Sequence, residues 1–153
     1  MRFVGEIFDR WQGFEWGTPE YCRFLESCIE LRVVPLLHCE NEVAAEIGER
    51  YPEGRFLLPH LDYRGDAANR IATLAPFPHL YADISGTGIA EAGAIKAAVE
   101  GLGADRVVFG TDLGCVDPVI AVQCVERAGL TADQKERVFA GSFKALLVWA
   151  EEG

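Results

Sequence analysis

The segment VVPLLHCE, residues 33–40, places a run of apolar residues directly before His38, Cys39 and Glu40. Such a run is typical of a strand that is buried on both faces, as parallel strands covered by helices are. A histidine at the end of one such strand is either a hydrogen-bonded structural residue or a ligand in a site. The two interpretations separate only if other strands end in the same way.

Short apolar segments alternate with helical segments along the whole chain. The predicted strands cover residues 2–8, 33–38, 55–60, 79–85 and 106–112, and the predicted helices cover 19–31, 40–51, 66–75, 92–102, 118–128 and 133–150. Thr18 before Pro19 and Thr131 are N-cap signals, whereas Gly101 and Gly103 end the fourth helix. The βαβα order predicts an α/β fold with five parallel strands.

Polar residues stand at the end of every predicted strand. They are Glu6, His38, His60, Asp83 with Ser85, and Asp112. The C-terminal ends of parallel strands share one edge of the sheet, where the active sites of α/β proteins form. Imidazoles combined with carboxylates suit zinc, manganese or iron and leave positions open for water. The pattern favours a divalent-metal site, although structural histidines and helix-capping acids would give the same residues.

The composition narrows the class of partner. The chain has 153 residues, half of them apolar, so we expect one domain over residues 1–153. Its 24 acidic and 14 basic side chains give a net charge of −10, which disfavours nucleic acid and membrane surfaces and leaves a small-molecule substrate. Five cysteines without a CxxC pair or a secretory signal predict reduced thiols in the cytoplasm.

Five segments resemble one known family. GEIF (5–8), LLHCE (36–40), LLPHLD (57–62), LYADISGTG (80–88) and VVFGTDLG (107–114) are similar to the last five strands of the amidohydrolase-related metal-dependent hydrolases, the branch that includes carboxymuconate-semialdehyde decarboxylase-like enzymes. The resemblance implies a partial (β/α)8 TIM barrel, with five βα units corresponding to strands 4–8. An open five-stranded parallel sheet is the alternative; a flavodoxin-like sheet lacks support because no glycine-rich phosphate loop follows the first strand.

The resemblance also implies roles for the residues at the strand ends. His38 and Asp112 would be metal ligands, and Asp112 would also accept the proton of the attacking water. His60 would bind a second metal or polarise the substrate. Glu6 would be a further ligand, because the TatD-like deoxyribonucleases use the glutamate of a GE dipeptide in this way. The expected cofactor is a divalent metal ion, zinc first and manganese or iron as alternatives.

Other residues have two interpretations each. Arg64 would clamp a substrate carboxylate or pair with a neighbouring aspartate. Ser85 and Asp83 would line the pocket or stabilise the barrel layers, and Trp11 would floor the pocket or cover the barrel mouth. His79 precedes a strand, which is the wrong end for a site, and is interpreted as structural. Cys39 alternates with His38 and should point into the core.

The chain departs from the family pattern at the first strand. No His-x-His occurs, and a complete barrel needs about 250 residues, so the first three βα units are missing. The chain would be a fragment, pair with a complementing barrel half, or form an open sheet. Because unpaired edge strands are templates for association, we expect a homo-oligomer or a complementing half.

Two hypotheses of function follow. The first is a metal-dependent hydrolase, in which metal-activated water attacks an amide, ester or lactone carbon, or a related decarboxylase. The activity of this chain alone would be weak or absent. The second is a catalytically silent, truncated α/β domain that serves as an assembly or binding module. Metal content of the purified protein separates them.

Overall fold

The computed structural model describes residues 2–8, 12–61, 66–89 and 93–151. In these residues the elements follow in the order β1 (Phe3–Phe8), α1 (Pro19–Glu30), β2 (Val34–His38), α2 (Asn41–Arg50), β3 (Phe56–Leu58), α3 (Ala67–Leu74), β4 (Leu80–Asp83), η2 (Gly86–Ile89), α4 (Ala94–Leu102), η3 (Ala104–Arg106), β5 (Val107–Val108), α5 (Pro118–Arg127), α6 (Ala132–Glu136), the π-helical η4 (Arg137–Gly141) and α7 (Ser142–Glu151). None of these helices has both the length and the apolar composition that crossing a bilayer requires.

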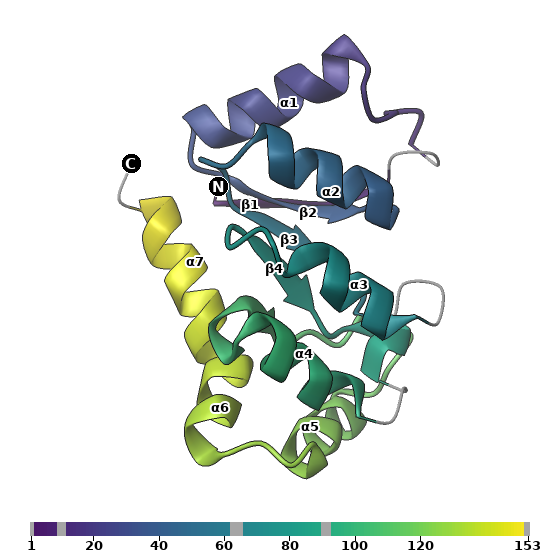
Figure 1. Cartoon of the computed structure of the whole chain (residues 1–153), viewed down its shortest axis with the longest axis vertical. Helices are drawn as coiled ribbons and strands as arrows, with labels where there is room; N and C mark the ends of the chain where they lie inside the picture. Colours follow the sequence, from purple (N-terminus) through teal and green to yellow (C-terminus); the bar gives the residue numbers. More distant parts are fainter. Residues whose placement is uncertain (1, 9–11, 62–65, 90–92, 152–153) are drawn as a thin grey trace.

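The described strands form one open parallel sheet whose spatial order, β1-β2-β3-β4-β5, is their order in the chain (Figure 1). The register runs through Phe3↔Val34, Leu36↔Leu57, Leu57↔Tyr81 and Ala82↔Val107. Each strand therefore reaches its neighbour through one helical crossover, which is the repeating unit of a (β/α)8 barrel. The prediction of five consecutive parallel βα units is confirmed.

One face of the sheet is covered by α1, α2, α3 and α4. Strand residues such as Leu37, Phe56, Leu58 and Leu80 are completely buried there. They pack against the apolar stripes of these helices, which include Tyr21, Leu25, Ala44, Ile47, Leu74 and Ala98. Burial of continuous apolar strands under crossover helices supplies the main core. Cys39 belongs to this core at 1% exposure, as predicted from its alternation with His38.

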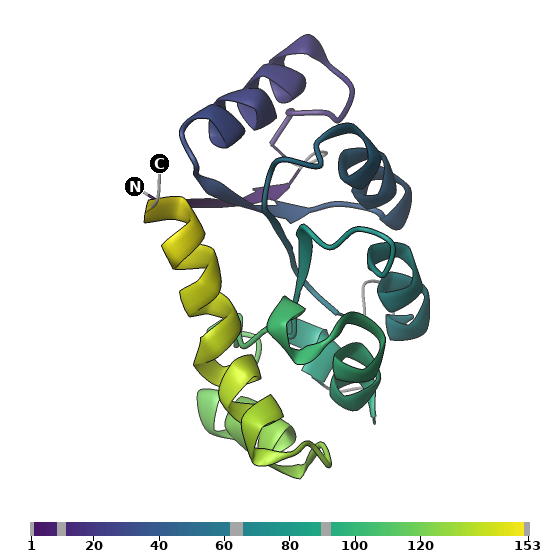
Figure 2. The same cartoon turned by 60° about the vertical axis from the view of Figure 1, so that its left-hand side comes forward.

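The opposite face, which would be the inner face of a barrel, is covered in part by α7. Figure 2 shows α7 (yellow) across the sheet from α1, α2, α3 and α4. Its Leu146 is fully buried against Val34, Leu57 and Val108. At the start of α7, the ring of Phe143 stacks on that of Phe3 at 4.7 Å between centroids. This second core occupies the end of the face nearest the strand starts and leaves the strand ends to polar residues.

The helix signals of the sequence are confirmed, except that Gly101 lies within α4 and does not end it. The Thr18 side chain accepts a hydrogen bond from the Tyr21 amide at 3.3 Å, with Pro19 in the first turn. Thr131 and Gln134 form a capping box at the start of α6. Helix α4 ends at Leu102, immediately before Gly103.

The last strand is shorter than predicted. The prediction extended it over 106–112, whereas β5 contains only Val107 and Val108. The cause is the next amide: Phe109 N–H donates at 3.0 Å to the carbonyl of Val138, in η4, rather than to a strand. Asp112 consequently lies in the loop after the sheet. The predicted helix over 133–150 is also interrupted, because residues 137–141 are π-helical and Ser142 donates its hydroxyl to Ala104 O at 2.7 Å.

Candidate metal centre

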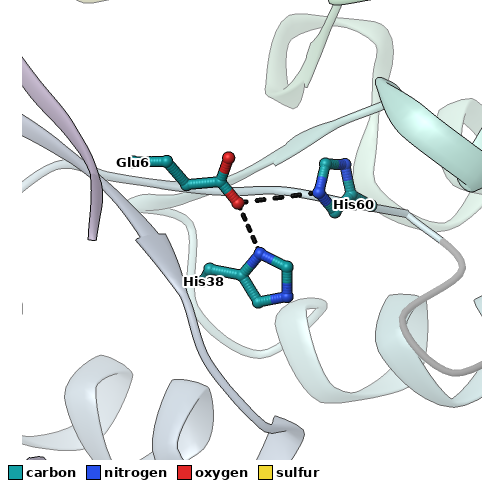
Figure 3. Close-up of side chains that lie close together, drawn as sticks. All are labelled: Glu6, His38 and His60. Carbon is teal, nitrogen blue, oxygen red and sulfur yellow. Dashed lines mark hydrogen bonds and ion pairs between the residues drawn. The ribbon is translucent and has the colours of Figure 1, made fainter. Parts of the chain in front are cut away.

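Three of the predicted rim residues come together at the C-terminal ends of β1, β2 and β3 (Figure 3). Glu6 lies in β1, His38 is the last residue of β2, and His60 follows β3 by two residues. One potential ligand atom from each of the three lies within 4.8 Å of the others. Their side chains are 22%, 19% and 14% exposed, so the group is half-buried and open to solvent on one side. The convergence predicted from the strand ends is observed for these three.

Glu6 lies between the two imidazoles. Its Oε1 is hydrogen-bonded to His38 Nδ1 and lies 3.6 Å from His60 Nε2. The Phe8 ring stacks on His38 at 4.3 Å between centroids, and the His60 ring meets His38 edge-on at 5.2 Å. Because the ring faces are packed, both imidazoles have little rotational freedom. A carboxylate oxygen and two nitrogens therefore face a common point.

The orientation of His60 is set by the segment that follows β4. His60 Nδ1 lies 3.1 Å from the Ser85 carbonyl oxygen and 3.1 Å from Ser85 Oγ. A carbonyl only accepts, so Nδ1 carries a proton and Nε2 is the ring nitrogen that faces Glu6. Metal-binding histidines are commonly held in this way, with the second ring nitrogen donating to a carbonyl. His60 is thus prepared as a metal ligand.

Asp83 is a buried acid beside the group. It is 8% exposed and its carboxylate accepts a hydrogen bond from the Ser85 amide. Burial raises the pKa of Asp83, while the hydrogen bonds from Ser85 and the nearby His60 oppose that rise. Gly110 gives the carboxylate room, since a Cβ at position 110 would lie 2.7 Å from Asp83 Oδ2. Asp83 therefore fixes the segment that orients His60.

Asp112 is not one of the three residues whose ligand atoms lie within 4.8 Å of one another. It lies in the loop after β5 with a φ of 53°, and its carbonyl accepts from the Cys115 amide at 2.8 Å. A hydrogen bond with the Asp112 side chain raises the pKa of the exposed Cys115 thiol. The structure brings Glu6, His38 and His60 together without Asp112. Its role as a ligand and proton acceptor stays a prediction.

The other predicted site residues are placed as follows. Trp11 and Arg64 lie outside the described residues, so their predicted substrate contacts are not tested. Ser85, predicted as a substrate contact, is 5% exposed and bonded to His60. His79 is buried between Phe56 and Phe77 on the helix-covered side, in agreement with a structural role. The prediction missed two glycines that give the site its room: Gly86, which lies in the ISG segment, and Gly110, which lies in the FGTD segment.

The donor set fits a divalent metal ion. Imidazole nitrogen and carboxylate oxygen are the ligands that zinc, manganese and iron share. Three such donors on the rim of consecutive βα units define a class: metal-dependent hydrolases and lyases built on a βα-barrel. A sequence profile described as amidohydrolase matches residues 4–142. The chain belongs to the amidohydrolase family.

Solved structures agree with this assignment. An amidohydrolase from Burkholderia multivorans with bound zinc has a TM-score of 0.71 and 16% identity, over 86% of this chain and 58% of that one. A dihydroxybenzoic acid decarboxylase from Polaromonas sp. JS666, with manganese and the inhibitor 2-nitroresorcinol, has a TM-score of 0.67 and 15% identity over 86% and 54%. The 5-carboxyvanillate decarboxylase of Sphingomonas paucimobilis has a TM-score of 0.65 and 16% identity over 84% and 53%.

The similarity to these structures concerns the fold, and it covers only part of each. The chain spans between 53% and 58% of their length. No curated protein sequence matches it. The open sheet therefore corresponds to a part of a (β/α)8 barrel.

Proposed function

We propose that this chain forms the C-terminal five βα units of a metal-dependent amidohydrolase that hydrolyses an amide, ester or lactone or decarboxylates a small carboxylic acid. The observation that carries the proposal is the group Glu6, His38 and His60, whose ligand atoms converge within 4.8 Å. The zinc and manganese in similar structures support a divalent ion, and we propose zinc first. The chain's own thiols, all free, suit the reducing cytoplasm in which we place it.

Each residue of the site has a distinct task in this proposal. Glu6, His38 and His60 would hold the ion, while the Ser85 carbonyl accepts from His60 Nδ1 and so directs Nε2 toward it. When bound, such an ion lowers the pKa of a water to about 7 and polarises a carbonyl. A carboxylate oxygen of Asp112 accepts the proton of the attacking water, for which its loop must bring it to the rim. Arg64 and Trp11, which follow β3 and β1 in the sequence, contact the substrate.

Activity requires more than this chain. Glu6, His38 and His60 reach the three protein ligands that a catalytic zinc site needs, but family members also take a pair of ligands from the first strand. The chain has no such pair. We propose that a polypeptide with the three remaining βα units supplies this pair and completes the barrel, that a second copy would cover the open edges without supplying the pair, and that the isolated chain has weak activity or none.

Metal analysis of the purified chain tests the proposal. After dialysis against metal-free buffer and incubation with zinc, the wild type should retain close to one equivalent, and His38→Ala and His60→Ala should lose it. His79→Gln is the matched control, because the third histidine lies in the core. Zinc content equal to that of the buffer blank would leave the catalytically silent assembly domain as the function.

A further inference from the structure

Arg70 is a completely buried arginine directly behind the metal centre. It lies in α3 and is 0% exposed. Its Nη1 donates to the Cys39 carbonyl at 3.2 Å and to Asn41 Oδ1 at 3.0 Å. Its Nη2 donates to the Pro59 carbonyl at 3.0 Å. One guanidinium therefore binds the chain at the ends of both β2 and β3.

The two carbonyls adjoin the two histidines in sequence. Cys39 follows His38 and Pro59 precedes His60. The register between β2 and β3 is defined by the single pair Leu36↔Leu57, which lies before both histidines. Toward the histidines, the described residues show no further ladder pair between these two strands. The guanidinium bridges them at the point where the two imidazoles must be held at a set separation.

The geometry points to Arg70 as a positioning residue that sets the separation between His38 and His60. Its consequence for metal binding rests on the function proposed above. Arginine suits the task because its planar fork directs several donors at fixed angles, whereas a lysine ammonium acts as a single point. A buried charge is weak evidence for stability, since an apolar residue of similar volume is often as stable. The need to hold His38 and His60 at a fixed separation explains the buried arginine better than a contribution to stability does.

The test compares Arg70→Met with Arg106→Met. Arg106 is a matched control: its Nη1 also donates to main-chain carbonyls, those of Leu74 at the end of α3 at 3.1 Å and of Phe77 in the loop before β4 at 2.7 Å, on the side of the strand starts. Two quantities are measured: the nuclear Overhauser effect between the His38 and His60 rings in metal-free protein, and the dissociation constant for zinc. Arg70→Met should lose the ring-to-ring signal and bind zinc about 10 to 100 times more weakly. Arg106→Met should lower the melting temperature and keep both.

Arg70→Lys keeps the inference testable if Arg70→Met fails to fold, because lysine retains the charge and most of the length of the side chain. It should fold and still weaken the ring-to-ring signal. Retention of that signal in both Arg70 variants overturns the inference, as does an equal loss in Arg106→Met. If the wild type binds no zinc, the proposed function fails, but the ring-to-ring signal of the metal-free protein still decides the role of Arg70.

Discussion

Gly86 controls how closely the chain after β4 approaches the His60 ring. Its φ is +64°, and a Cβ there would lie 2.7 Å from His60 Nδ1. We predict that Gly86→Ala destabilises the fold by about 1 to 2 kcal/mol through the left-handed backbone and also displaces the ring. Urea unfolding measures the first effect, and zinc affinity, which should fall about tenfold, measures the second.

The control for this variant is Gly13→Ala. Gly13 has a φ of +65°, but a Cβ there would have no atom of the described residues within 4 Å. The two alanines carry the same backbone strain, so their difference isolates the contact with His60. Equal zinc affinity of the two variants would contradict the role assigned to Gly86.

His79 should make stability depend on pH. Burial, followed by the charge of Arg55, lowers the pKa of this imidazole below its ordinary value of 6.5. The unfolded chain then binds protons more readily, so the contribution of neutral His79 is complete above pH 6.5 and is lost as the pH falls through the lowered folded value. When the pH is lowered from about 7.5 to about 5.5, the melting temperature of His79→Gln should fall less than that of the wild type. Parallel curves for the two proteins would contradict this.

At the level of single residues, the sequence predicted the positions that follow directly from strand geometry. Glu6, His38 and His60 end parallel strands, and such ends meet at one edge. Arg70 was not predicted, although the buried residues of α3, Ala67, Arg70, Ile71 and Leu74, have helical spacing. An arginine on that apolar stripe was the available signal. Only packing could show which carbonyls it reaches.

At the level of elements, α7 is the least predictable part. Its segment was predicted to be helical, but helices of a closed barrel lie outside the strands. Here the inner face has no opposite strands within the described residues, and Leu146 and Trp149 of α7 pack against it. The positions of Arg32 and Arg55, whose guanidinium groups lie 5.4 and 5.5 Å from the Trp149 ring centroid, support the same arrangement. Local periodicity could not decide between the two faces.

Leu146 tests whether α7 is docked on that face. It is fully buried, so Leu146→Ala should destabilise the protein by about 3 kcal/mol through lost burial and the cavity that remains. Val148, two residues later, is 52% exposed, and Val148→Ala should change stability by less than about 0.5 kcal/mol. Urea unfolding of both variants provides the measurement. Similar small effects would mean that α7 does not pack on the sheet in solution.

For the whole molecule, the order of the sheet leaves β1 and β5 with one neighbour each in the described residues. Apolar hollows adjoin β1 on both sides of Val4. One, of about 260 Å³, is also lined by Phe3, Leu36, Leu57 and Phe143. The other, of about 200 Å³, is lined by Phe24, Cys28, Leu31 and Val33. A strand added beside β1 would find a pocket for alternate side chains on either face.

This edge predicts association of the isolated chain. An exposed apolar edge strand pairs with another chain, and a lysine on it opposes that pairing because the ammonium cannot be buried without a partner. Light scattering after size exclusion should therefore show the wild type as a dimer or larger, and Val4→Lys shifted toward the monomer. Ala68→Lys, which adds the same charge on the exposed side of α3, should leave the assembly unchanged. A monomeric wild type at high protein concentration would contradict this prediction and would show that α1 and α7 already protect the edge. An unpaired edge strand would then be no reason to expect a complementing barrel half.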